Sequence, residues 1–303
     1  MRDRFTTFAL HFGKRRSKKQ KNRFIMMLLD VMEPLGYLLK MQQFKFSGRE
    51  GRNIIVGNLE QAKLIYMVDY DTKERIINDH YRYYPFDENF NLKVLRANYL
   101  KYMVTACLLL AFGTLSFFLG RNRQDWVSYL FYGLSVTGAI GSFIFAKALG
   151  SPYNFKKTAS AFMLCELAKQ RNKECCYVFL DHSLFIGAGQ YEFFQEYDLK
   201  GKTVVYIDNA AIGTLTVVQT SKNTNKEFLH YLQKKKELFE VRITPMEIAE
   251  NNDFTFLYIT LCEKDESNLY YIDHISTKTD SEFKEEDYQN LINVLLEIQT
   301  EIL

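Results

Sequence analysis

The chain has 303 residues and a formal net charge of +3 at pH 7, and this length accommodates one large domain together with an insertion. Its five cysteines are an odd number, and Cys175 and Cys176 are adjacent, so they give no disulfide framework and suit a reducing compartment. The sequence has no phosphate-binding loop, nucleophile elbow, Cys-x-x-Cys pair or His-Glu-x-x-His helix, so the enzyme classes that depend on these motifs have no support.

The first segment, residues 1–23, is strongly basic. It holds nine lysines and arginines against Asp3 alone, and it has no apolar core of the kind that a signal peptide has. Two interpretations are open. The segment binds anionic lipid headgroups, at on the order of 1 kcal/mol per basic residue near a membrane surface, or it is a solvated basic tail without a specific partner. A membrane insertion later in the chain favours lipid over nucleic acid.

Two apolar patterns alternate through the rest of the chain outside residues 99–149. Short β-branched or aromatic runs predict strands at residues 53–56, 64–70, 176–180, 203–207, 215–220, 254–261 and 269–275. Apolar residues at i, i+3 and i+4 predict helices at residues 24–41, 158–171, 225–239 and 285–302. Strands whose neighbours are helices indicate an α/β domain, so residues 24–98 and 150–303 should form one domain around a largely buried sheet.

Two charge-free apolar runs interrupt this domain, at residues 103–119 and 126–146. Each is close to the roughly 20 residues that cross a hydrocarbon core of about 30 Å as a helix, and residues 121–125 between them allow only a tight turn. Lys101 and Lys147 stand where their ammonium groups can reach the interface. Residues 99–149 are therefore predicted to be a transmembrane helical hairpin, and the alternative is a pair of buried core helices.

The distribution of basic residues predicts the orientation of this hairpin. Three basic residues precede the first run and three follow the second, whereas the connecting turn has only Arg121 and Arg123. Because basic flanks stay on the cytoplasmic side, we expect a multi-pass protein of the cell membrane with its large domain in the cytoplasm.

An aromatic stripe at residues 81–86 (YRYYPF) lies just ahead of the first apolar run. Tyrosine is favoured at headgroup depth, so one interpretation is an interfacial belt. The other is packing of the inserted segment onto the α/β domain.

Several segments of the α/β part resemble one known family in the same order along the chain. Residues 53–57 read NIIVG, residues 63–72 KLIYMVDYDT, residues 159–169 ASAFMLCELAK, residues 177–181 YVFLD and residues 204–209 VVYIDN. With Gly189 ahead of Phe193 and Phe194, and with the closing residues 274–280, they resemble the co-catalytic zinc aminopeptidases (metallopeptidase family 28, clan MH). The resemblance implies a zinc-aminopeptidase-like sandwich with a central mixed, mostly parallel sheet flanked by helices, interrupted here by the two-helix transmembrane hairpin.

The resemblance also implies where a metal site would be. Members of the family hold two zinc ions about 3.5–4 Å apart, with a bridging Asp and a Glu that acts as base for the attacking water. Carried onto this sequence, the first ligand is Asp69 in place of a histidine, Asp71 is at the position that orients it, and the later Asp ligand is retained as Asp208. The remaining positions have lost their chemistry: Lys156 at the bridge (or Tyr153 in a second register), Ser183 at the base, Leu184 at the adjoining ligand and Ser276 at the terminal histidine.

These replacements imply a chain without catalytic residues, metal or cofactor. With Lys156 at the bridge, its ammonium would lie among Asp69, Asp71 and Asp208 as a structural substitute for the metal. The alternative is a solvated Lys156 drawn, with Lys157, to lipid headgroups.

An alternative metal site would use Asp69, His182, Asp208 and His274 as ligands. His and carboxylate suit zinc, but a lysine at the bridge places a positive charge where the ion would sit, so the site is disfavoured. Asp181, next to His182, is interpreted as a surface carboxylate.

The sequence therefore indicates a membrane-anchored, catalytically inactive aminopeptidase-like protein (a pseudopeptidase) that binds a peptide or protein partner at the cytoplasmic membrane face. Two alternatives stay open. One is a divergent membrane-bound metallo-aminopeptidase with an altered metal site, and the other is a structural subunit of a membrane transport or export complex.

Overall fold

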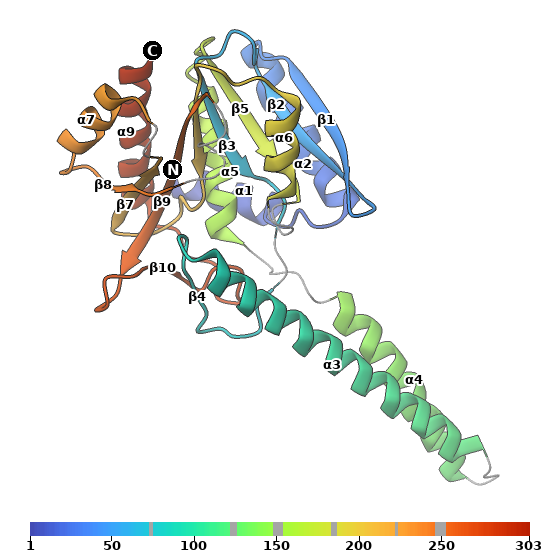
Figure 1. Ribbon diagram of the computed structural model, residues 1–303. Coiled ribbons are helices and arrows are strands. Elements are labelled where there is room, and N and C mark those ends of the chain that lie inside the picture. The colour runs from blue at the N-terminus through green and yellow to red at the C-terminus, as the bar shows by residue number, and fades with distance from the viewer. Residues whose placement is uncertain (73–74, 122–125, 148–153, 183–186, 222–223, 246–252) are drawn as a thin grey trace.

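The computed structural model describes the chain except for residues 73–74, 122–125, 148–153, 183–186, 222–223 and 246–252 (Figure 1). Its helices are α1 (Arg2–Phe12), α2 (Lys18–Met32), the 3-10 helix η1 (Glu33–Leu35), α3 (Glu88–Arg121), α4 (Trp126–Lys147), α5 (Phe155–Ala168), α6 (Ala188–Glu196), α7 (Lys226–Lys234) and α9 (Glu285–Ile302). Its strands are β1 (Leu39–Phe46), β2 (Arg49–Val56), β3 (Leu64–Asp69), β4 (Arg82–Tyr83), β5 (Cys175–Leu180), β6 (Thr203–Ile207), β7 (Leu215–Thr220), β8 (Glu240–Ile243), β9 (Thr255–Lys264) and β10 (Tyr270–Asp273).

The strands form one mixed sheet in the order β1-β2-β5-β3-β6-β9-β10-β4, and β7 pairs with β9 and β8. The central strands β5, β3, β6 and β9 are parallel neighbours, whereas β1, β2, β10 and β4 pair antiparallel at the two edges. Every residue of β3 and β5 is buried, which explains why both strands read as continuous apolar runs. The α/β fold with a mixed, centrally parallel sheet that the sequence predicts is confirmed.

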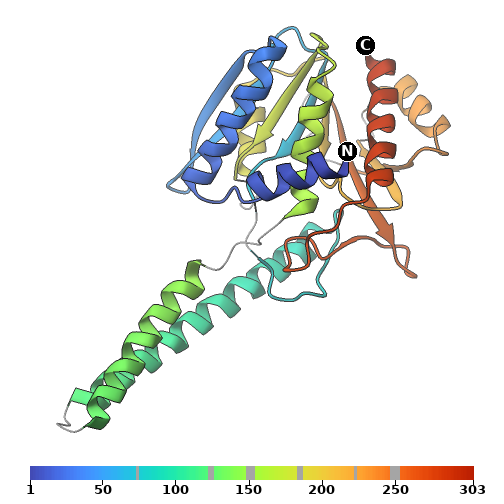
Figure 2. The ribbon, with the colours of Figure 1, turned by 180° about the vertical axis from the view of Figure 1, so that it is seen from behind.

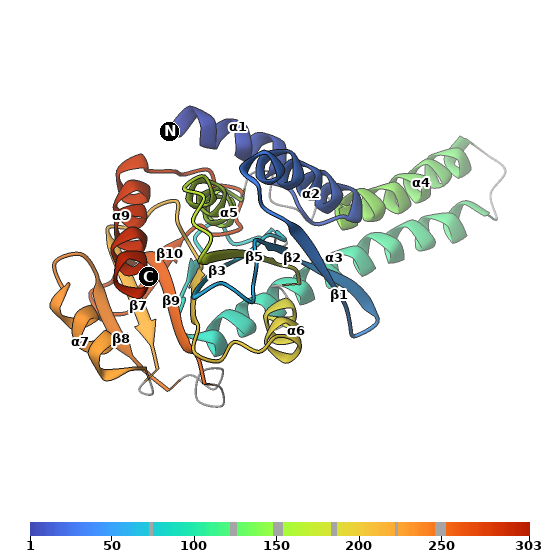
Figure 3. The same cartoon turned by 90° about the horizontal axis from the view of Figure 1, so that it is seen from above.

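Helices cover both faces of the sheet. Successive side chains of a strand point to opposite faces, so Tyr66 and Val68 of β3 join one core with α1, α2, α5 and α9. Ile65 and Met67 join the other, with Phe193 of α6. Seen from above, α1, α2 and α5 lie on one side of the sheet and α6 on the other (Figure 3).

The predicted helix at residues 24–41 is wrong beyond Met32. The helix α2 begins at Lys18, behind a capping box formed by Ser17 and Gln20, and ends at Met32. Gly36 then takes a left-handed conformation with φ +83°, which stops helical continuation. The residues that follow form β1, whose polar and half-exposed side chains give it no clear apolar pattern.

The basic N-terminal segment is folded onto the domain. The helix α1 occupies residues 2–12, and its Phe5 and Ala9 are buried in the main core. The Phe5 ring contacts Phe155 of α5 at 5.1 Å between ring centroids. Both interpretations of a free tail therefore apply only to the exposed basic side chains of this segment.

The two apolar runs form the helices α3 and α4, which lie side by side and project away from the α/β domain (Figures 1 and 2). Glycines make their close approach possible, because a Cβ at Gly138 would lie only 3.0 Å from the Cα of Gly113. Most of the α3 surface is exposed. In the described part of the chain, α3 is the one helix long and apolar enough to cross a membrane.

The aromatic stripe packs onto the domain. Tyr81 is buried, β4 pairs with β10, and the Phe86 ring contacts Tyr258 and Tyr270 at centroid distances of 5.6 and 5.4 Å. These contacts support the packing interpretation over an interfacial belt.

Candidate functional site

The candidate site lies where the central parallel strands end. Asp69 is the last residue of β3, and Asp208 directly follows β6. Because β3 and β6 are parallel neighbours, their carboxyl ends lie at the same end of the sheet, called the carboxyl edge below. This brings the two carboxylates together. Lys157, in the first turn of α5, reaches between them: its Nζ lies 3.3 Å from Oδ2 of Asp69 and donates to Oδ1 of Asp208.

The three charged side chains are almost completely buried. Lys157 is 3% exposed, Asp69 8% and Asp208 1%. Burial alone would lower the pKa of Lys157, but the charges of Asp208 and Asp69 together with the neighbouring Tyr206 outweigh it and hold that pKa well above the ordinary lysine value. The side chain is therefore an ammonium ion at neutral pH.

Tyrosine hydroxyls also donate to the two carboxylates. Tyr206 donates to Oδ2 of Asp69 at 2.7 Å, and Tyr258 donates to Oδ2 of Asp208 at 2.5 Å. Burial, and then the aspartate charges, raise the pKa of both tyrosines well above the usual range, which keeps them as donors. The resulting cluster (Lys157, Asp69, Asp208, Tyr206 and Tyr258), called the lysine–aspartate cluster below, is closely hydrogen-bonded.

The hypothesis that Lys156 fills this position is wrong by one residue. The Nζ of Lys156 lies 3.7 Å from Oδ1 of Asp280 and 3.9 Å from Glu282, on another side of α5. Successive residues of a helix point about 100° apart, since 3.6 residues make a turn, so a one-residue error moves the ammonium to a different face. Solvation with headgroups is equally wrong, because Lys156 is 1% exposed.

Asp280 ties the start of α5 to the closing segment. It accepts from the backbone N–H of Lys156 at 3.2 Å and of Ser276 at 2.8 Å. Burial raises its pKa, and the nearby Lys156 opposes this in part. Ser276 is buried, but its hydroxyl has no hydrogen-bond partner in the described part of the chain.

Asp71 lies close enough to a different cation, Arg15, for its charge to stabilise the guanidinium. The Arg15 side chain has no exposed surface; its Nη1 donates to Oγ1 of Thr158 at 3.2 Å and its Nε to the carbonyl of Tyr70. Burial lowers the pKa of Arg15 to about 10, and the charge of Asp71 opposes this shift. This residue of the basic segment is thus part of the domain interior.

Asp181 is a buried ion-pair partner rather than a surface carboxylate. It is 2% exposed, and it accepts from Nζ of Lys21, from the backbone N–H of Arg52 at 3.1 Å and from the Tyr70 hydroxyl at 3.2 Å. Lys21, a second member of the basic N-terminal segment, therefore forms an ion pair within the domain.

Asp69 and Asp208 of the disfavoured metal site lie together, but its two histidines do not join them as ligands. A ring nitrogen of His182 is 2.9 Å from the carbonyl of Glu50, and Nδ1 of His274 is 2.5 Å from the carbonyl of Asp79. Among the described residues no group of three or more His, Cys, Asp or Glu side chains could hold a metal ion. The donor set does not fit zinc, since an ammonium stands between the two aspartates. Ser183, Leu184 and Tyr153 lie outside the described residues.

Sequence reasoning missed Arg15, Lys157 and the tyrosines of the cluster. Lys157 is adjacent to Lys156, the lysine predicted from the sequence, and no motif distinguishes the two. Tyr206 and Tyr258 occupy equivalent positions on neighbouring strands, and they read as ordinary strand aromatics.

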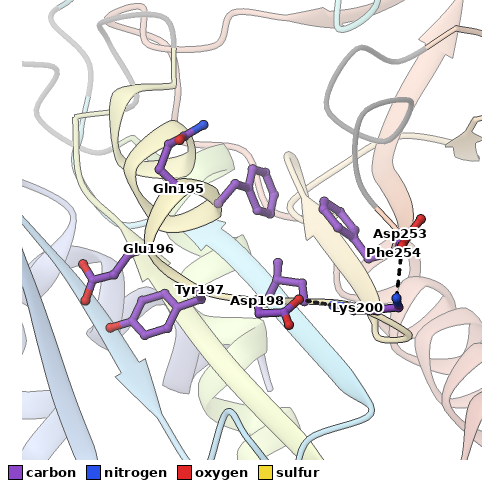
Figure 4. Close-up of a pocket in the computed structure, with 9 residues that line it drawn as sticks. Gln195, Glu196, Tyr197, Asp198, Lys200, Asp253 and Phe254 are labelled. Carbon is purple, nitrogen blue, oxygen red and sulfur yellow. Dashed lines mark hydrogen bonds and ion pairs between the residues drawn. The ribbon is translucent and has the colours of Figure 1, made fainter.

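A separate hollow of about 550 Å³ lies at the opposite edge of the sheet (Figure 4). It is lined by the end of α6 and by residues that precede β6 and β9, including the ion pair of Lys200 with Asp253 at 3.5 Å. These are the amino ends of the parallel strands, so the hollow is remote from the lysine–aspartate cluster. Both partners of the ion pair are mostly exposed, and the hollow brings no catalytic constellation with it.

No family model matches the chain, and no curated protein matches it in sequence. Solved structures match across nearly its whole length. Porphyromonas gingivalis glutaminyl cyclase is 10% identical with a TM-score of 0.57, over 99% of this chain and 96% of that one. The Legionella pneumophila aminopeptidase LapA is 10% identical with a TM-score of 0.54, over 98% and 67%. A putative zinc-dependent exopeptidase from Bacteroides vulgatus is 10% identical with a TM-score of 0.51, over 97% and 92%. At this identity the likeness shows the fold alone, which is the aminopeptidase-like α/β fold.

Proposed function

We propose that this chain is a membrane-anchored, non-catalytic member of the aminopeptidase-like fold, in which Lys157 takes the structural place of metal ions. The observation that carries the proposal is the position of the Lys157 ammonium between Asp69 and Asp208. Two buried carboxylates at one point need a compensating cation, and here the chain supplies it from α5. A divalent ion at the same point would have to displace a fixed, buried positive charge.

The surroundings of Lys157 support a structural role rather than a catalytic one. A catalytic lysine works as a base or nucleophile when its pKa is lowered toward neutrality. The pKa of Lys157 is instead raised, and its acidic partners are further held by two tyrosine hydroxyls. The cluster therefore holds α5 against the ends of β3 and β6, and Lys157 offers no free amine at neutral pH.

The membrane part of the proposal is supported by α3. This 34-residue helix exposes large apolar side chains such as Leu108, Leu115 and Phe118, which would be unusual on a solvated helix. We place α3 and its partner α4 across the bilayer, with the α/β domain on the cytoplasmic side as the basic flanks favour. The role left to such a domain is binding of a peptide or protein segment, as a pseudopeptidase or as a subunit of a membrane complex.

An activity assay on the full-length protein in detergent tests this proposal. Peptides with free N-termini are supplied with added zinc, and release of the first residue is followed; a second set with N-terminal glutamine is followed for cyclisation, because a glutaminyl cyclase shares the fold. We expect no turnover above buffer in either set. Zinc-dependent turnover that disappears in Asp208→Asn would overturn the proposal in favour of a divergent metalloenzyme.

A further inference from the structure

Exposed basic side chains gather at one end of the α/β domain. They come from the turn between α1 and α2 and from the tip of the β1–β2 hairpin, and we call them the basic face: Lys14, Arg16, Lys18, Lys19, Lys45 and Arg49. The two segments are neighbours, because Nζ of Lys18 lies 3.7 Å from Oε2 of Glu50 at the start of β2. Glu50 is a single acidic side chain within this group, so positive charge dominates.

The basic face lies at the same edge of the sheet as the lysine–aspartate cluster. Both β1 and β5 run antiparallel to β2, so the end of β1 points the same way as the end of β5, with β2 between them. This carboxyl edge is also the end of the domain from which α3 and α4 project (Figures 1 and 2). Charge, site and hairpin therefore share one side of the molecule.

Contacts between α3 and the α/β domain determine where this carboxyl edge lies relative to the apolar run at residues 103–119. Asn98 accepts from the backbone N–H of Ile77 at 2.9 Å and donates to the carbonyl of Arg75, and the Tyr102 hydroxyl donates to the same carbonyl at 2.9 Å. The apolar run begins at the next residue, Met103. The domain thus touches α3 directly at the point where the hydrocarbon core would start.

From this placement we propose that the basic face binds anionic phospholipid headgroups and holds the carboxyl edge of the sheet against the bilayer. The inference rests on the membrane placement of α3 proposed above. Lysines and arginines close to an anionic leaflet are attracted to it within a Debye length, so the interaction depends on salt. Arg15 and Lys21 take no part, since Arg15 is buried and Lys21 forms an ion pair with the buried Asp181.

Energy transfer to labelled lipids in nanodiscs tests the proposal. Full-length protein carrying Cys107→Ser receives a donor dye at Gln43→Cys, an exposed position beside the basic face; the other four cysteines are buried. Nanodiscs of phosphatidylcholine with phosphatidylglycerol contain a trace of acyl-chain-labelled phosphatidylglycerol or, in a parallel sample, of acyl-chain-labelled phosphatidylcholine. We expect greater transfer to labelled phosphatidylglycerol at low salt, and equal transfer at high salt.

Two matched triple variants complete the design. Lys18→Gln, Lys19→Gln and Lys45→Gln together should abolish the preference, whereas Lys63→Gln, Lys173→Gln and Lys200→Gln, which are exposed at the opposite edge, should leave it intact. Equal transfer to both lipids in the unmodified chain, or an unchanged preference in the first triple variant, would overturn the proposal. A protein that stays in solution and never enters nanodiscs would instead overturn the membrane placement itself.

Discussion

Buried carboxylates at the carboxyl edge of the sheet are matched by cations from the same chain. Asp69 and Asp208 share Lys157, Asp181 has Lys21, and Asp280 has Lys156. Burying an isolated carboxylate costs free energy. Each ion pair therefore offsets a negative charge that would otherwise destabilise the fold. In this account the lysines stabilise the fold and have no role in binding a substrate.

The substitution Lys157→Met tests that role by keeping the stem and deleting the charge. Removing one partner of a buried ion pair costs about 3–5 kcal/mol, so the free energy of unfolding should fall by that order. Because the folded pKa of Lys157 is raised, its contribution is fully present below the ordinary lysine pKa and is lost only as pH rises through the raised value. The stability gap to wild type should therefore persist between about pH 6 and pH 9.

Denaturant titration across that pH range measures the gap. The control is Lys200→Met at the opposite edge, where an exposed pair should contribute less than about 1 kcal/mol. A Lys157→Met protein as stable as the control variant would show that the ammonium is dispensable.

The substitution Lys157→Asp asks whether the position can be returned to metal chemistry. It replaces the ammonium with a third carboxylate beside Asp69 and Asp208, so the variant should be strongly destabilised without a divalent ion. Added zinc should raise its melting temperature, because an ion that binds only the folded state stabilises it. Thermal melts with and without zinc measure this, and a wild-type protein that zinc stabilises equally would contradict the account.

At this scale the sequence predicted a lysine among Asp69, Asp71 and Asp208; the structure places a lysine at Asp69 and Asp208, but it is the neighbour of the one selected. The distinction depends on how α5 begins at Phe155, and Asn154, although asparagine is a favoured N-cap residue, makes no side-chain cap hydrogen bond there. Arg15 could not be found either, because a run of basic residues carries no sign of which member turns inward.

Among the elements, the α3–α4 pair depends on small residues at its contact. Gly138→Ala would place a Cβ 3.0 Å from the Cα of Gly113 and from the carbonyl of Leu109, so the helices must separate. We expect this variant to lose thermal stability in detergent. Gly133→Ala is the matched control, because its Cβ would meet nothing within 4 Å and alanine favours a helix by about 1 kcal/mol over glycine. Equal melting temperatures for the two variants would contradict the packing.

The orientation of the pair is testable from the outside of intact cells. With the domain in the cytoplasm, a membrane-impermeant maleimide should label Arg121→Cys at the end of α3 and should miss Lys200→Cys in the domain. Both positions are exposed on the protein itself, so the membrane alone decides the result. Labelling of Lys200→Cys in intact cells would reverse the proposed topology.

The prediction of helices and strands was correct where the apolar pattern was long or uninterrupted. It was wrong where a single residue ended a helix. The buried strands β3 and β5 follow directly from their apolar runs. The boundary between α2 and β1 depends on the left-handed Gly36, and β1 has an irregular burial pattern that resembles neither a helix nor a half-buried strand.

For the whole molecule, the order of segments was enough to predict the architecture, which structures of glutaminyl cyclases and exopeptidases share at about 10% identity. The fold survives at such identity because it depends on alternating burial in the strands and on helix faces, and many sequences supply these. Individual site residues do not follow from the fold, because a single side-chain exchange can change the chemistry of a site without changing the sheet.

Metal content is the quantity that most directly tests the central claim, that the Lys157 ammonium occupies the place of zinc. The full-length protein, purified without chelator, is incubated with excess zinc, desalted and analysed for elemental zinc per chain. The account predicts far less than one zinc ion per chain. One or two zinc ions per chain, lost on substitution of Asp69 or Asp208, would contradict it.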